Sequence, residues 1–102
     1  MRFSGRVLKL CSRVPEGRVT TYGEIAKAAG KPGSSRAVGQ VLKRNPRPVE
    51  IPCHRVVRSD GKLGGYGGSG RENEERKKAL LRREGVRIEK NKIRVKEYLY
   101  RF

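Results

Sequence analysis

Residues 21–44 read TYGEIAKAAGKPGSSRAVGQVLKR and predict two short helices joined by a tight turn. Thr21 and Glu24 have the spacing of a capping box, in which a hydroxyl and a carboxylate close the first turn of a helix. This helix is expected to continue to Ala29, because the stretch 30–33 holds glycine and proline residues that favour a turn. Two short helices joined in this way in a basic protein are typical of a helix-turn-helix, here about 21–44.

The second helix of this pair has two different faces. It begins at Ser34 or Ser35, either of which can cap it, and runs to about Arg44 before Asn45-Pro46 breaks it. At 100° per residue, apolar side chains gather on one face and polar or small ones on the opposite face. The first face holds Val38, Val41, Leu42 and Asn45, and the second holds Arg36, Gly39, Gln40 and Lys43.

The polar face of this helix is suited to contact nucleic acid. Ala37 and Gly39 give it little bulk, so its backbone can approach a groove closely, while Arg36 and Lys43 supply positive charge. An ordinary solvated helix would also carry Arg and Lys, but a glycine in its middle lowers its stability. We therefore predict that this face binds DNA through Arg36, Ala37, Gly39, Gln40 and Lys43.

Two more helices are predicted outside this unit. Apolar residues fall at helical spacing over 3–14, where an amphipathic helix is expected with Cys11 on its buried face. A helix over about 71–84 is acidic at its start and basic at its end, as the helix dipole prefers. After it, apolar residues alternate around 90–92 and predict a terminal β-hairpin. The expected fold is therefore mainly α with small β hairpins, a single helix-turn-helix domain of winged-helix type over 1–102.

The charge of the chain is strongly one-sided. Its 102 residues hold 26 Lys and Arg against 10 Asp and Glu, a formal net charge of +16. Such an excess of cations predicts a nucleic-acid partner, because neutralising phosphates releases counterions; the alternative is an ordinary solvated surface. Since the sequence has no long apolar run or signal peptide, we expect no membrane partner and a cytoplasmic location, at the nucleoid if the source is prokaryotic.

The stretch Pro52-Cys53-His54-Arg55-Val56 places one of two cysteines beside the only histidine. A thiol becomes a strong nucleophile when it loses its proton, and a neighbouring imidazole or positive surroundings promote that loss. The prolines in 47–52 forbid a helix there, so Cys53 is expected on a stiff extended segment. The alternative is a small buried cysteine beside a surface histidine. Both cysteines are expected as free thiols, and the single histidine falls short of the usual four-ligand zinc set, so we expect no metal.

Glu84 is an acid in an unusual place on the last predicted helix. It follows the apolar pair 80–81 at helical spacing, so its side chain points along the buried face, where a carboxylate needs a partner. His54 is one candidate, in a relay in which Glu84 orients His54 and His54 activates Cys53, lowering the Cys53 pKa. The other candidates are nearby arginines at the surface edge: Arg82, Arg83 and Arg87.

These motifs, in this order, resemble the DNA-binding and active-site domain of the O6-alkylguanine-DNA alkyltransferases. The resemblance runs in register from Val14 to Gly85. It covers the approach to the helix-turn-helix, the recognition helix, an asparagine turn and the active-site strand, at 14–22, 36–39, 45–46 and 51–57. Pro-Cys-His-Arg-Val is a specific signal downstream of such helices, whereas the five letters alone would be weak.

The resemblance implies roles for the residues that carry out the chemistry. Cys53 would accept the alkyl group, with His54 deprotonating it through a water and Glu84 orienting His54. Tyr66, in a glycine-rich loop over 64–70, would donate a hydrogen bond to the flipped base. The backbone of Gly67, which stands where the family has a serine, could still bind the guanine O6.

Other positions would bind the DNA or support the site. Arg36 would enter the base stack in place of the flipped guanine, and Tyr22 would press on the adjoining phosphate. The Val56 backbone would read the guanine amino group. Asn45 would brace the helix-turn-helix against the active-site loop, with Arg55 as a further supporting residue.

The function implied is direct displacement by the Cys53 thiolate on O6-alkylguanine flipped out of double-stranded DNA. A thioether has no easy reversal, so the protein would act once, as a monomer and without a cofactor. Most active family members carry a further domain before the helix-turn-helix. Residues 1–13 supply only the short helix that normally follows that domain. The alternatives are an alkyltransferase-like lesion binder that recruits other repair factors, a helix-turn-helix regulator that dimerises on a palindrome, and a cysteine hydrolase. The lesion binders lack the cysteine, so Cys53 favours transfer.

Overall fold

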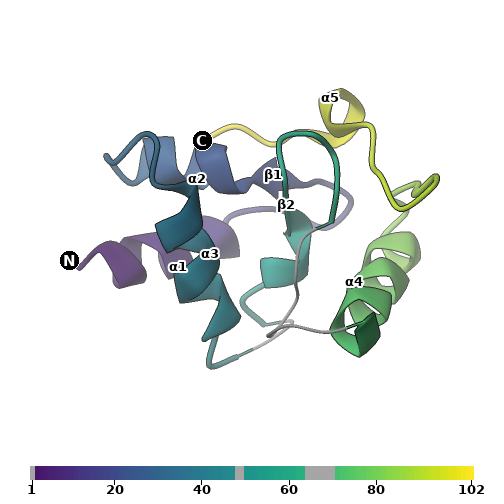
Figure 1. The fold of residues 1–102 in the computed structure, drawn as a ribbon, viewed down its shortest axis with the longest axis horizontal. Helices are drawn as coiled ribbons and strands as arrows, with labels where there is room; N and C mark the ends of the chain where they lie inside the picture. The colour runs from purple at the N-terminus through teal and green to yellow at the C-terminus, as the bar shows by residue number, and fades with distance from the viewer. Residues whose placement is uncertain (1, 48–49, 64–70) are drawn as a thin grey trace.

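The computed structural model describes residues 2–47, 50–63 and 71–102, with the backbone alone for 71–73. The described chain contains the helices α1 (Phe3–Ser12), α2 (Tyr22–Ala28), α3 (Ser35–Lys43), α4 (Arg71–Arg83) and α5 (Val95–Tyr98), the 3₁₀ helix η1 (Cys53–Arg55), and the strands β1 (Thr20–Thr21) and β2 (Val56–Val57) (Figure 1). The predicted glycine-rich loop 64–70, with Tyr66 and Gly67, lies outside the described residues.

The predicted helix-turn-helix is confirmed as α2 and α3. Thr21 is the N-cap of α2, and its side-chain oxygen accepts a hydrogen bond of 3.1 Å from the Glu24 backbone N–H. Gly30 and Gly33 have φ of +85° and +87°, which lets the chain turn sharply between the helices. Ser34 is the N-cap of α3, but its side chain forms no capping hydrogen bond. Its ψ of 33° lies far from the extended conformation that aims a hydroxyl at the first N–H groups.

Two hydrophobic clusters meet at β2. The first lies among α1, α2, α3 and η1, and consists of Val7, Cys11, Ile25, Ala26, Val38, Leu42, Cys53 and Val56. The second lies between α4 and the C-terminal segment, and consists of Val19, Val57, Leu63, Leu81, Val86 and Ile93. Val56 and Val57 enter different clusters because successive side chains of a strand point in opposite directions. Cys11 is a buried core residue, as predicted.

The strand pairing differs from the prediction of β hairpins. β1 and β2 pair in parallel, with Thr20 opposite Val56 and Thr21 opposite Val57, and α2, α3 and η1 lie in the connection between them. A parallel pair needs such a long crossover, so no local turn signal marks it in the sequence.

Of the predicted terminal hairpin, only the turn is present. Glu89 and Lys92 exchange backbone hydrogen bonds of 2.9 Å, but no named strand flanks this turn in the described chain, and Val95 begins α5. The chain after the turn pairs elsewhere, because the Ile93 N–H binds the Gly61 carbonyl at 2.9 Å. Further on, the Val19 N–H binds the Tyr98 carbonyl, so the C-terminal segment lies along the outer side of β1.

Within 2–47, 50–63 and 71–102, none of the helices has the length and apolar character needed to cross a membrane.

Candidate active site and DNA-binding face

Cys53 begins a tight turn instead of continuing an extended segment. Its side chain is buried in the first hydrophobic cluster, and the following turn is closed by a hydrogen bond of 2.9 Å from the Arg55 N–H to the Pro52 carbonyl. Of the active-site strand expected over 51–57, only the last two residues form a strand, β2, which follows η1. Proline restricts its own φ and the residue before it, but leaves the residues after it free to turn. The turn carries the His54 side chain into the interior, where it is fully buried.

His54 and Glu84 are in contact, as predicted. His54 Nε2 lies 2.9 Å from Glu84 Oε2. The competing arginine partner is Arg55 rather than the arginines of α4 or Arg87: its Nε and Nη2 donate to Glu84 at 2.9 and 2.7 Å. Its Nη1 also donates to the Val14 carbonyl at 2.8 Å. Arg55 therefore holds Glu84 against His54 and ties the pair to the segment after α1.

The contacts of Glu84 decide which His54 nitrogen carries a hydrogen. Burial opposes ionisation of Glu84, but hydrogen bonds from Arg55 and His54 outweigh it, and its pKa lies below the ordinary value. An ionised carboxylate only accepts hydrogen bonds, so Nε2 is the protonated nitrogen and the basic lone pair is on Nδ1. Burial lowers the pKa of His54, with the Glu84 contact opposing it in part. The imidazole is thus neutral near pH 7 and able to accept a proton.

The predicted lowering of the Cys53 pKa is wrong. Burial raises the pKa of this thiol, while a hydrogen bond from Asn45 and the charge of Lys77 oppose the rise only in part. The desolvation of a thiolate in the core exceeds the stabilisation that its surroundings supply. Cys53 therefore stays a thiol until a base removes its proton. Cys11 is a poorer nucleophile, because deeper burial raises its pKa to about 12.

Asn45 links the end of α3 to the segment before Cys53. Its Nδ2 donates to the Ile51 carbonyl at 2.8 Å, and its Oδ1 accepts from the Arg47 N–H at 2.9 Å. Both bonds lie within the break after α3, so the side chain replaces the helical hydrogen bonds that end there. The predicted bracing position of Asn45 is present in the structure.

Lys77 is a residue of this site that the sequence analysis missed. Its fully buried ammonium donates to the Val56 carbonyl and lies 5.8 Å from the centre of the Tyr22 ring. Burial lowers its pKa to about 8. The signal was available, because Lys77 precedes Leu81 by four residues and Glu84 by seven, and so shares their face of the helix. The Val56 carbonyl, which is expected to accept a hydrogen bond from the guanine amino group, thus already accepts one from Lys77. It has one lone pair left for guanine.

The exposed face of α3 agrees with the sequence pattern. Arg36, Ala37, Gln40 and Lys43 are exposed, Gly39 is half-buried, and Val38 and Leu42 are buried. Tyr22, at the start of α2, packs beside this face: a Cβ placed on Gly39 would lie 4.0 Å from its ring. Burial raises the pKa of Tyr22 to about 12, so its hydroxyl keeps its proton. α3 therefore presents a basic surface with little bulk at its centre.

Residues 2–86 match the family model of the 6-O-methylguanine DNA methyltransferase DNA-binding domain. The chain belongs to this family. It is 48% identical over 87 residues to a methylated-DNA–protein-cysteine methyltransferase of Methanothermobacter thermautotrophicus, covering 85% of this chain and 46% of that protein. With the Archaeoglobus fulgidus protein of the same name, identity is 52% over 86 residues, covering 82% and 56%. The chain thus spans about half the length of these relatives.

Solved structures of similar fold include DNA complexes. S. pombe Atl1 in complex with damaged DNA containing O6-carboxymethylguanine has a TM-score of 0.87 and 34% identity, over 100% of both chains. Mycobacterium tuberculosis OGT in complex with DNA has a TM-score of 0.75 and 45% identity, over 82% of this chain and 50% of that one. The small mostly helical domain with its parallel strand pair is therefore the DNA-binding fold of the alkyltransferase family.

The site of this family member draws on three parts of the chain. η1 supplies the thiol and imidazole, α4 and the residue after it supply Lys77 and Glu84, and α3 supplies the exposed cations. Tyr66 and Gly67 lie outside the described residues, so their expected contacts with the base stay predictions. Among the described residues, no group of three His, Cys, Asp or Glu side chains is placed to hold a metal ion.

Proposed function

We propose that this protein removes alkyl groups from O6 of guanine in double-stranded DNA by transferring them to Cys53, once per molecule. The observation that carries the proposal is the hydrogen bond of 2.9 Å between the buried His54 and Glu84, next to the thiol in sequence. An imidazole oriented by an acid beside a thiol is the arrangement that activates a nucleophile by removing its proton.

Base flipping is the first step of the proposed reaction. An alkyl group on guanine O6 inside a duplex cannot reach a buried thiol, so the nucleotide must leave the stack. Arg36, exposed on α3, fills the vacated space, and Tyr22 presses on the neighbouring phosphate. The small residues at 37 and 39 let the helix approach the groove closely.

Transfer follows as a direct displacement at the alkyl carbon. His54 Nδ1 takes the Cys53 proton through a water, and the charge on the resulting imidazolium is balanced by Glu84. The sulfur forms a bond to the alkyl carbon as the bond to O6 breaks, and the electron pair leaves with guanine. Tyr66 supplies a proton to that guanine. Lys77 stabilises the transient thiolate electrostatically, because its charge favours ionisation of Cys53.

The partner is duplex DNA that contains O6-alkylguanine, and the protein acts as a monomer, without a cofactor, in the cytoplasm or at the nucleoid of a prokaryote. The names of its relatives and the DNA complexes of its structural neighbours support DNA as the partner. The net charge of +16 supports it as well, since phosphate contacts dominate DNA affinity.

A second candidate function is lesion binding without transfer. It is favoured by the likeness to S. pombe Atl1 over the whole of both chains, because that protein was solved with damaged DNA. The two functions differ in what happens to Cys53.

The mass of the intact protein separates these functions. After incubation with duplex DNA containing O6-methylguanine, a transferase gains one methyl group per molecule, and Cys53→Ser gains none while still binding the duplex. Tight binding by the wild-type protein with no mass change on long incubation would establish the lesion binder instead.

A further inference from the structure

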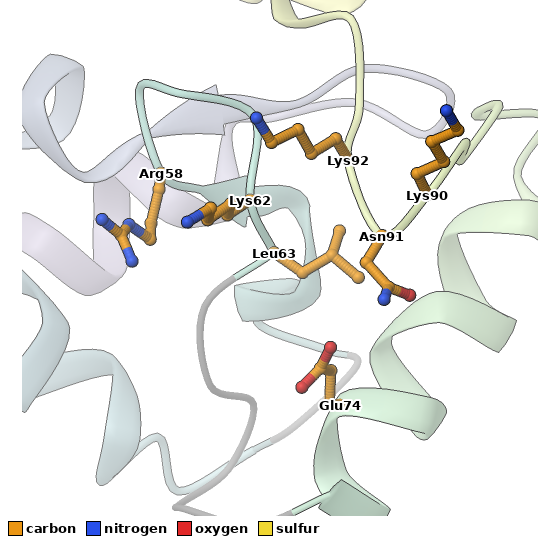
Figure 2. Close-up of a pocket in the computed structure, with 7 residues that line it drawn as sticks. All are labelled: Arg58, Lys62, Leu63, Glu74, Lys90, Asn91 and Lys92. Atoms are coloured by element: carbon orange, nitrogen blue, oxygen red, sulfur yellow. The ribbon is translucent and has the colours of Figure 1, made fainter.

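Two turns from distant parts of the sequence meet beside α4 and carry a cluster of cations (Figure 2). We call residues 58–62 and 89–92 the paired turns. The Ile93 N–H binds the Gly61 carbonyl at 2.9 Å, and Lys62 and Lys92 form an antiparallel bridge. Gly61 has a φ of +89°, and a Cβ there would lie 2.4 Å from the Ile93 carbonyl oxygen. The backbones of the paired turns are thus in close contact, which brings the residues that carry these cations close together.

A pocket of about 380 Å³ lies between the paired turns and α4. Its lining is Arg58, Lys62, Leu63, Glu74, Lys90, Asn91 and Lys92 (Figure 2). The three acids near these cations already have partners: Asp60 lies 3.4 Å from Arg58, Glu74 lies 3.9 Å from Lys78, and Glu89 lies 3.9 Å from Arg87. None of the three lysines forms an ion pair with a residue that the structure describes. The pocket therefore has positive charge in excess and hydrogen-bond donors suited to an anion.

The tip of the second turn has an unfavourable backbone conformation. Lys90 and Asn91 have φ of 50° and 61°, in the left-handed region that glycine prefers. Two-residue turns of this kind favour Asn-Gly, and lysine is a poor residue for the first position. Such conformations are concentrated at functional sites. Here the turn places Lys90 on the rim of the pocket.

The paired turns lie on the side of the molecule that carries Tyr22. Tyr22 and Arg58 directly follow the paired ends of β1 and β2, where Thr21 lies opposite Val57, so the two residues are near one another. Positive charge thus continues from α3, past Tyr22, to the paired turns. Lys90 and Lys92 lie beyond residues 2–86, the part of the chain that matches the family's DNA-binding domain.

The geometry points to a second DNA-binding site at the paired turns, which binds backbone phosphates of the duplex beside the stretch bound by α3. This inference rests on the DNA binding of the proposed function, but not on alkyl transfer. Lys62, Lys90 and Lys92 are the phosphate ligands, and the Asn91 amide is a further donor. The C-terminal segment therefore extends the DNA-binding surface beyond the family domain.

Salt dependence of binding to an undamaged duplex tests the site. The logarithm of DNA affinity falls linearly with the logarithm of salt concentration. The magnitude of this slope decreases by about 0.9 for each phosphate contact removed. The variant Lys62→Gln/Lys90→Gln/Lys92→Gln should therefore lose a slope of about 2 to 3. The control Lys9→Gln/Lys27→Gln/Lys96→Gln removes the same charge from exposed positions outside the pocket, and should lose much less. The variant with arginine at 62, 90 and 92 should keep the wild-type slope.

Equal losses of slope in the pocket variant and the control would overturn the inference. Circular dichroism melting checks that the variants are folded. If the triple variant is not, Lys62→Gln and Lys92→Gln are measured singly, and each should lose a slope of about 1. Alkyl transfer from free O6-alkylguanine base is measured in parallel. The pocket variant should transfer the alkyl group at the wild-type rate. If the wild-type protein itself does not transfer, the proposed function is contradicted, while the salt slopes still test the second site.

Discussion

Replacing Glu84 by Gln tests the proposed relay most directly. The carboxylate accepts three hydrogen bonds, from His54 Nε2 and from Nε and Nη2 of Arg55, at 2.7 to 2.9 Å. A carboxamide has one acceptor oxygen and no charge, so it cannot satisfy all three donors. Breaking a partly buried ion pair in this way should cost about 2–4 kcal/mol of unfolding free energy. That is less than the ~5–15 kcal/mol typical of a folded protein, so Glu84→Gln should still fold.

The expected effect of Glu84→Gln on alkyl transfer follows from the charge on His54. Glu84 raises the His54 pKa against the larger effect of burial, so its removal lowers that pKa further. A lower pKa makes His54 a weaker base and should slow transfer by about 10- to 100-fold. Because transfer requires neutral His54, the rate rises with pH through the His54 pKa and then levels off. In the variant this rise should move to lower pH and the plateau should fall.

Single-turnover transfer from O6-methylguanine duplex, followed from pH 4.5 to 8.5, measures both effects. Glu75→Gln is the matched control, because Glu75 is an exposed acid on α4, the helix that Glu84 directly follows. DNA affinity should change less than about twofold, since the Glu84 carboxylate binds His54 and Arg55 and is not on the exposed face of α3. If Glu84→Gln and Glu75→Gln react at equal rates when both are folded, the relay is refuted.

Three further predictions concern base flipping, a buried charge and the paired turns. Arg36→Ala should slow repair of duplex DNA far more than reaction with free O6-alkylguanine base, because only the duplex requires flipping; equal losses would place Arg36 in the chemistry or the fold. The Lys77 pKa of about 8 is below the ordinary 10.5, so the unfolded chain binds more protons between these values and stability rises with pH. The free energy of unfolding of the wild type, measured with urea relative to Lys77→Met, should therefore rise by on the order of 3 kcal/mol from pH 8 to 10.5. A difference between the two proteins that does not change with pH would contradict the burial of Lys77. Gly61→Ala should lower stability by more than Gly33→Ala: both have positive φ, at a cost of about 1 kcal/mol, but only at Gly61 does the added Cβ meet the Ile93 carbonyl.

The sequence alone determined the elements whose signals are local. The Thr21 cap, the glycines of the turn and the alternation of faces on α3 act between residues three or four apart, and the structure confirms each of them. The inward position of Glu84 followed from the same helical spacing. Such signals depend on the geometry of one helix, which does not change with its surroundings.

Only the tertiary structure decided how these elements meet. The pairing of β1 with β2 and the contact of the paired turns join segments about 30 residues apart or more, and neither has a local signal. The Arg55 clamp on Glu84 depends on η1 turning after Pro52. The raised pKa of Cys53 and the burial of Lys77 depend on how much water the packed helices exclude. Desolvation is a property of the assembled core, so no spacing within the sequence could show that it exceeds the effect of the neighbouring charges.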